Sequence, residues 1–253
     1  MTETVFLNRL IVSWFILAAG TGILLAFVSA PYGRHARQGW GPTMGNRLGW
    51  VIMEAPAPLL FAACFVLGEY HDSITAWAFF LMWEAHYIPR SFIYPLRLRP
   101  SGKQMPLVIV GLGLVFNGFN GYMNGRYLFT FSGGYPDAWL TDPRFLIGLT
   151  LFVMGYAINR RSDGTLSRLS RQSGSGYAIH HGGLYRWISC PNYLGEIVQW
   201  FGWALATWSW VGLAFAIWTA ANLVPRAFSH HRWYRQQFPD YPPRRKALLP
   251  GIW

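Results

Sequence analysis

The chain has 253 residues, of which 53% are hydrophobic, 18% aromatic and only 12% charged. Soluble domains carry roughly 25% charged residues, so this composition excludes an ordinary soluble protein and is typical of an integral membrane protein. The net charge of +11 does not indicate nucleic-acid binding, because the basic residues lie between apolar segments, where membrane proteins concentrate them in cytoplasmic loops.

Seven apolar segments follow one another along the chain. They cover residues 10–30, 50–68, 74–96, 105–123, 144–158, 192–208 and 210–228. Because one membrane span needs about 20 residues, seven spans use nearly the whole length and leave no room for a soluble domain. We therefore expect an all-α fold, a bundle of seven transmembrane helices forming one domain over residues 1–253, with the first segment retained as a span.

The positions of the basic residues predict an orientation for these spans. With seven spans, 18 of the 21 Lys and Arg fall in loops on one side of the membrane, and only Arg9, Arg126 and Arg144 fall on the other. The basic side faces the cytoplasm, so the N-terminus is predicted to be external and the C-terminus cytoplasmic. The stretch 159–191 becomes a long cytoplasmic loop, and 229–253 a cytoplasmic tail.

Three glutamates lie inside apolar segments: Glu54, Glu84 and Glu196. A charge at the bilayer centre costs at least ~2.5–3.5 kcal/mol, so such residues usually face a partner, a cavity or a ligand. They indicate a polar site within the membrane.

Near the cytoplasmic boundary, polar residues recur at helical spacing, which places them on common faces. They form the pairs Asn159 with Asp163 and Asn192 with Glu196, and the stripe Arg226, His230 and Tyr234. Amides and carboxylates suit sugar hydroxyls or a carboxamide, and Arg suits phosphate, so together they could bind a large anionic molecule. The alternative is that they cap helix ends and anchor side chains at the interface.

Deeper in the membrane, Glu54 precedes Pro56 and Pro58, which leave backbone groups open to other partners. Tyr87, Arg90 and Tyr94 form a polar stripe along the third segment. A protonated Glu54 and the Tyr87 hydroxyl could together donate hydrogen bonds to a ketone or enolate oxygen. Equally, a Glu–Tyr or Glu–Arg bond could simply satisfy the bundle.

The pattern of these residues resembles the steroid 5α-reductase family. The stretches that carry the resemblance are Tyr32–His35, Trp50–Pro56, His86–Tyr94, Gly183–Tyr185, Pro191–Glu196, Ala204–Ser209, Arg226–Tyr234, Asp240–Pro242 and Arg244–Leu248. They are spread over nearly the whole chain. The resemblance implies a seven-helix membrane enzyme that reduces the Δ4 double bond of 3-oxo-steroids with NADPH.

Carried over by position, the resemblance implies a role for each residue. Glu54 and Tyr87 would hold the C3 ketone. The NADPH-binding set would be Tyr32, Arg34, Trp50, Lys103, Asn159, Asp163, Arg168, Arg171, Asn192, Glu196, Arg226, His230 and Tyr234, with Arg168 and Arg171 as two candidates for one loop arginine. We expect a monomer in the lipid bilayer, in a bacterial inner membrane or, if eukaryotic, the endoplasmic reticulum, with no metal and no nucleic-acid partner.

Two other classes of function stay open. One is a membrane methyltransferase of the isoprenylcysteine carboxyl methyltransferase type, which uses S-adenosylmethionine and has a motif similar to Ser189–Tyr193. Those enzymes use an acidic pair in the last segment, whereas residues 226–239 contain no acid. The other is a sterol transporter or receptor, but no inverted repeat is visible in the sequence.

Overall fold

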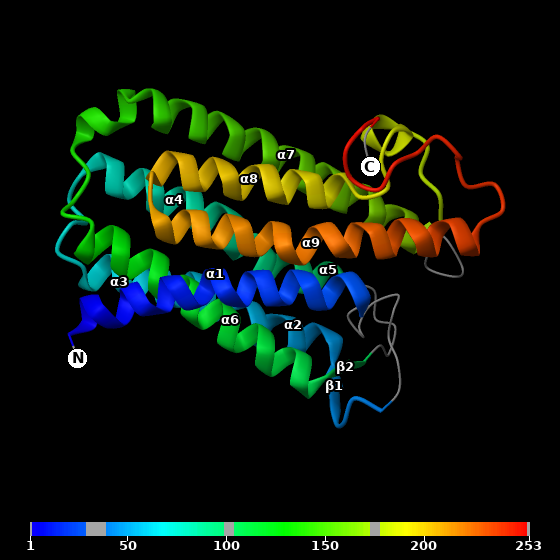
Figure 1. Cartoon of the computed structure of the whole chain (residues 1–253), viewed down its shortest axis with the longest axis horizontal. Coiled ribbons are helices and arrows are strands. Elements are labelled where there is room, and N and C mark those ends of the chain that lie inside the picture. The colour runs from blue at the N-terminus through cyan, green and yellow to red at the C-terminus, as the bar shows by residue number, and fades with distance from the viewer. Residues whose placement is uncertain (1, 29–38, 99–103, 173–177, 252–253) are drawn as a thin grey trace. The chain divides into compact units, whose positions relative to one another are not determined.

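The computed structural model describes residues 2–28, 39–98, 104–172 and 178–251, without the side chains of 171 and 172. The described chain is almost entirely helical (Figure 1). Its helices are α1 (Glu3–Phe27), α2 (Asn46–Glu54), α3 (Pro56–Leu67), α4 (Ile74–Ile88), α5 (Tyr94–Arg97), α6 (Leu107–Arg126), α7 (Pro143–Gln172), α8 (Pro191–Thr207) and α9 (Trp210–Gln237). Short strands β1 (Thr43–Gly45) and β2 (Gln104–Pro106) pair antiparallel, and turns of other helix types cover Pro89–Ile93, Tyr127–Phe131, Asp137–Thr141 and Gly183–Arg186.

The chain divides into two compact units. The first comprises Met1–Ile11 and Pro31–Leu146, and the second comprises Val12–Ala30 and Ile147–Trp253. Each unit has its own buried aromatic cluster. In the first, Phe61 stacks on Trp83 with ring centroids 4.5 Å apart, and in the second Trp200 packs on Phe215 at 4.3 Å.

The prediction of an all-α membrane protein is confirmed. Every predicted apolar segment overlaps one or more helices, and within the described ranges four helical stretches are long and apolar enough to cross a membrane: Glu3–Phe27, Asn46–Leu67, Leu107–Phe131 and Trp210–Gln237. The other three segments are helical but shorter or more polar, α8 for example having 17 residues. The number of spans and the sides of the termini stay predictions.

Two helices continue beyond the apolar segments that predicted them. α7 runs to Gln172, through the first part of the stretch expected to be a loop, and α9 runs to Gln237 rather than ending near 228. Hydropathy marks where a helix is apolar, but a polar extension without a proline can stay helical. These extensions carry several of the predicted polar residues.

Prolines divide the second predicted segment. Pro56 begins α3 directly after Ala55, because it has no N–H to continue the hydrogen bonding of α2. Two carbonyls near this break have side-chain partners. The Met53 carbonyl accepts from Asn117 Nδ2 at 2.8 Å, and the Ala57 carbonyl accepts from Trp83 Nε1 at 3.2 Å.

α7 and α8 meet through glycines that leave no space for a side chain, and Figure 1 shows the two helices running alongside each other. A Cβ on Gly155 would lie 2.4 Å from the Gln199 nitrogen, and a Cβ on Gly195 would lie 2.5 Å from the Asn159 nitrogen. Small residues of this kind let membrane helices approach closely. Here the close approach brings the polar residues of the two helices together.

Gly195→Ala should therefore destabilise the protein, by about 1–3 kcal/mol if it behaves like other overpacked interiors. Thermal unfolding in detergent measures this. Gly164→Ala is the matched control, because a Cβ there meets nothing within 4 Å and α7 gains a better helix former. Equal unfolding temperatures for the two variants would contradict the packing argument.

Candidate functional site

In the first unit, Glu54 ends α2 with its side chain buried. Its Oε1 lies 3.1 Å from Arg90 Nη2, and its Oε2 lies 3.5 Å from Asn117 Nδ2. Arg90 is also held by Trp50, whose indole ring lies 5.3 Å from the guanidinium carbon and whose Nε1 donates to the Arg90 carbonyl at 3.1 Å. The Glu–Arg bond that the sequence left as one alternative is thus present.

Tyr87 lies on α4 and is 3% exposed. Its ring packs against Trp83 with centroids 4.8 Å apart, and its hydroxyl accepts from Asn120 Nδ2 at 3.1 Å. Asn117 and Asn120, one turn apart on α6, therefore contact Glu54 and Tyr87 respectively. This α6 face links the two residues predicted to hold a ketone.

In the second unit, the predicted pairs on α7 and α8 are joined by hydrogen bonds. Asn159 Nδ2 donates to the Asn192 carbonyl at 3.0 Å and to Glu196 Oε2 at 3.4 Å, and Asn192 Nδ2 donates to Asp163 Oδ1 at 3.0 Å. The four side chains form one cluster of amides and carboxylates. Such groups can exchange hydrogen bonds with sugar hydroxyls and carboxamides.

Tyr193, which follows Asn192 on α8, connects this cluster to α9. The guanidinium carbon of Arg226 lies 5.5 Å from the Tyr193 ring centroid, and the His230 ring lies 5.4 Å from it. Arg226 Nη1 also donates to Asn222 Oδ1 at 3.3 Å. The structure thus brings Arg226 and His230 to one aromatic ring beside the amide and carboxylate cluster.

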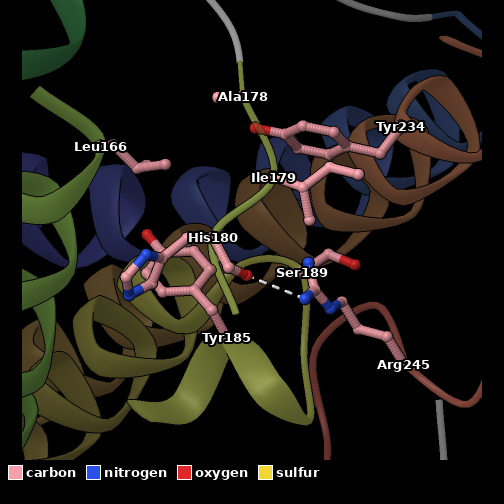
Figure 2. Close-up of a pocket in the computed structure, with 8 residues that line it drawn as sticks. All are labelled: Leu166, Ala178, Ile179, His180, Tyr185, Ser189, Tyr234 and Arg245. Carbon is pink, nitrogen blue, oxygen red and sulfur yellow. Dashed lines mark hydrogen bonds between the residues drawn. The ribbon is translucent and has the colours of Figure 1, made fainter. Parts of the chain in front are cut away.

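Tyr234, the third residue of the α9 stripe, is buried and lines a small pocket (Figure 2). Arg245 lines the same pocket, is 4% exposed, and donates from Nη2 to the His180 carbonyl at 2.8 Å. Within the described part of the chain, Arg245 Nε has no hydrogen-bond partner. The remaining residues around the pocket are Leu166, Ala178, Ile179, His180, Tyr185 and Ser189.

The Ser189 hydroxyl fastens the C-terminal segment beside this pocket. It donates to the Lys246 carbonyl at 3.0 Å, so its single proton is used there. It then accepts from Tyr241 and His231 Nδ1, both at 2.6 Å. Burial raises the pKa of the Tyr241 phenol, which keeps it a donor. Residues 187–190 and 245–247 are thereby held together.

The other predicted residues are placed as follows. Trp50 belongs to the first unit, in the network of Glu54 and Arg90. Arg168 is exposed on α7, and the side chain of Arg171 on the same helix lies outside the described residues. Tyr32, Arg34 and Lys103 also lie outside the described residues.

Sequence reasoning missed the asparagines of α6. Asn117, Asn120 and Asn124 recur at spacings of three and four inside an apolar segment, the same signal that singled out the pairs on α7 and α8. Arg245 and Ser189 were missed for another reason, because their proximity depends on how the C-terminal tail folds back.

The family model and the curated relatives that match this chain carry the same family description. Residues 103–253 match the family model described as 3-oxo-5-alpha-steroid 4-dehydrogenase. A steroid 5-alpha-reductase of Arabidopsis thaliana is 38% identical over 100% of this chain and 99% of its own. One from Gossypium hirsutum is 41% identical, covering 99% and 98%, and the bovine 3-oxo-5-alpha-steroid 4-dehydrogenase 1 is 42% identical, covering 91% and 90%.

Proposed function

The chain belongs to the 3-oxo-5-alpha-steroid 4-dehydrogenase family of steroid 5α-reductases, and from that premise we propose that it reduces the Δ4 double bond of 3-oxo-Δ4 steroids with NADPH. The observation that carries the proposal is the network around Glu54 and Tyr87. It presents polar groups, buried among apolar side chains, that suit the single ketone of an otherwise apolar substrate.

The residues of the second unit fit the chemistry of a dinucleotide. The amides and carboxylates of Asn159, Asp163, Asn192 and Glu196 would bind hydroxyl and carboxamide groups, and the guanidinium of Arg226 would bind phosphate. His230 and Tyr234, on the same helix as Arg226, offer further polar contacts. The proposed set is completed by Tyr32, Arg34, Trp50, Lys103, and Arg168 or Arg171.

The buried Arg245 adds an independent observation in favour of an anion. It is a cation with an unpartnered Nε, among the described residues, on the wall of a pocket shared with Tyr234. A buried donor left unsatisfied costs free energy, which an anionic ligand would recover.

When bound, NADPH would supply a hydride to C5 of the enone, and C4 would then take up a proton to complete the reduction. The part of Glu54 and Tyr87 is to stabilise the negative charge that develops on the C3 oxygen, by hydrogen bonds aimed at that atom. Tyr87 donates its phenol proton. Glu54 donates only in its protonated form, so it would take up a proton from solvent and give up the ion pair with Arg90 when the steroid binds.

We further propose that residues 1–253 act as one membrane domain of seven spans, monomeric, with an external N-terminus and a cytoplasmic C-terminus. The relatives match over the full chain, which supports one functional domain. Four helical stretches of membrane-spanning character support the location in a lipid bilayer, and the basic loops support the orientation.

Membership in a reductase family weighs against the methyltransferase and against a sterol transporter or receptor. The purified protein separates the three possibilities. We expect it to bind NADPH and to oxidise it when a 3-oxo-Δ4 steroid is added, but not with the corresponding 5α-saturated steroid. Binding of S-adenosylmethionine without NADPH binding would favour the methyltransferase, and steroid binding without turnover would favour the transporter.

A further inference from the structure

Three asparagines follow one face of α6: Asn117, Asn120 and Asn124. Their exposed fractions are 4%, 0% and 2%. Burying an amide without a hydrogen-bond partner costs about 2–7 kcal/mol. Three buried amides on an apolar helix are therefore expected to be hydrogen-bonded. All three are bonded, and the direction of each bond can be worked out.

α6 holds these amides on a fixed support. On an adjacent face, a Cβ on Gly121 would lie 2.7 Å from the Ala57 carbonyl oxygen, and a Cβ on Gly125 would lie 2.6 Å from Cys64 Cβ. α6 therefore packs directly on the backbone of α3. Side chains that project from such a contact are positioned by the helix rather than by a loop.

The hydrogen bonds decide which way each amide faces. Asn124 Nδ2 lies 3.1 Å from the backbone carbonyl of Asn120, which can only accept, so this group of Asn124 is the NH₂. The same NH₂ lies 3.1 Å from the side-chain oxygen of Asn120 and donates its second proton there. The NH₂ of Asn120 consequently faces Tyr87 and donates to its phenol oxygen at 3.1 Å.

From these hydrogen bonds we propose that Asn120 is a positioning residue for the reduction. The proposal rests on the proposed function. Asn124 fixes the amide of Asn120, and Asn120 in turn makes the Tyr87 oxygen an acceptor. The phenol proton is thereby directed away from α6 and given to the ketone oxygen of the steroid. A hydroxyl that accepts a hydrogen bond also becomes a stronger donor, so the same contact strengthens the bond to the ketone.

A double-mutant cycle tests this role. Asn120→Leu keeps the approximate size but removes the donor, and we expect kcat to fall about five- to tenfold, the worth of one neutral hydrogen bond, with NADPH affinity unchanged. In the Tyr87→Phe background the same substitution should change kcat less than about twofold, because the hydroxyl it acts on is gone. If the double variant lost kcat by the product of the two single losses, the proposal would be contradicted. Full activity of Tyr87→Phe would contradict it as well.

Asn117→Leu is the matched control. It lies on the same face of the same helix, is similarly buried, and is bonded to Met53 and Glu54 instead of Tyr87. Its effect should multiply with that of Tyr87→Phe. If Asn117 and Asn120 behaved alike in the cycle, the specific link between Asn120 and Tyr87 would be refuted.

The carbonyl stretch of a bound steroid gives a readout without turnover. A 3-oxo-Δ4 steroid with ¹³C at C3, bound together with NADP⁺, should show its C3 carbonyl band at lower frequency in the wild type than in Asn120→Leu. Tyr87→Phe should raise the frequency as well, and the double variant no further. If the wild type neither binds nor reduces the steroid, the proposed function fails and this role with it. If the wild type does both but Asn120→Leu leaves band and kcat unchanged, only the positioning role fails.

Discussion

Glu54→Gln is expected to lower kcat strongly, by up to about 100- to 1000-fold, the range for complete loss of a donor to a developing oxyanion, because the Gln amide is a much weaker donor than a protonated carboxyl. The amide has the shape of the carboxyl, but it is a far weaker acid and cannot form the ion pair with Arg90. The affinity for NADPH should stay within about twofold, because the amides and carboxylates proposed to bind it lie on α7 and α8. Steady-state kinetics and direct NADPH titration measure the two quantities separately.

Glu84→Gln provides the control for that substitution. Glu84 is a second buried glutamate of the same unit, on α4, with no role in the proposed site. Its variant should retain kcat within about twofold if only the position of Glu54 matters, since replacing a buried acid by an amide of the same shape leaves the packing intact. A Glu54→Gln enzyme that turns over normally but loses NADPH would assign Glu54 to the cofactor instead.

Arg226→Ala is expected to weaken NADPH binding by about 10- to 100-fold. A hydrogen bond to a charged group contributes about 1.5–3 kcal/mol, which corresponds to that change in Kd. The guanidinium stands over Tyr193, beside the cluster of Asn159, Asn192 and Glu196, so its loss removes the proposed phosphate partner and leaves the hydrogen bonds of that cluster in place. Turnover at saturating NADPH should recover most of the wild-type rate.

Arg232→Ala separates the local effect from the general loss of positive charge. Arg232 lies on the same helix but its side chain is exposed. A drop in NADPH affinity equal to that of Arg226→Ala would mean that net charge, and not the contact at Arg226, controls binding. Raising the ionic strength in parallel titrations gives the same comparison, because exposed charges are screened more strongly than partly buried ones.

Much of the architecture could be predicted from the sequence, because membrane helices consist of long runs of apolar residues. Two of the residue pairs proposed to bind the cofactor could be predicted from spacing alone to share a helix face. Asn159 with Asp163, and Asn192 with Glu196, each lie on a common helix face, and hydrogen bonds join the two pairs. Hydropathy could not show that α7 continues to Gln172, since a helix of mostly polar residues has no apolar signal.

Contacts between residues that are far apart in the chain could not be predicted from the sequence. The partner of Glu54 depends on the bend at Pro56 and on the packing of α6, and both Arg90 and Asn117 are far from it in the chain. The same holds for Ser189, which meets Lys246 only because the tail folds back. A resemblance to a family can assign roles to residues by position. The proposed role of Asn120 in orienting Tyr87, in contrast, is inferred from the hydrogen bonds of the structure.

The most direct test of the proposed reduction follows the hydride itself. The purified protein is mixed with NADPH carrying deuterium in both positions at C4 of the nicotinamide and with a 3-oxo-Δ4 steroid, and the product is analysed by mass spectrometry and NMR. The proposal predicts a 5α-reduced steroid with one deuterium at C5. A steroid recovered without deuterium, or with the label at another carbon, would contradict it.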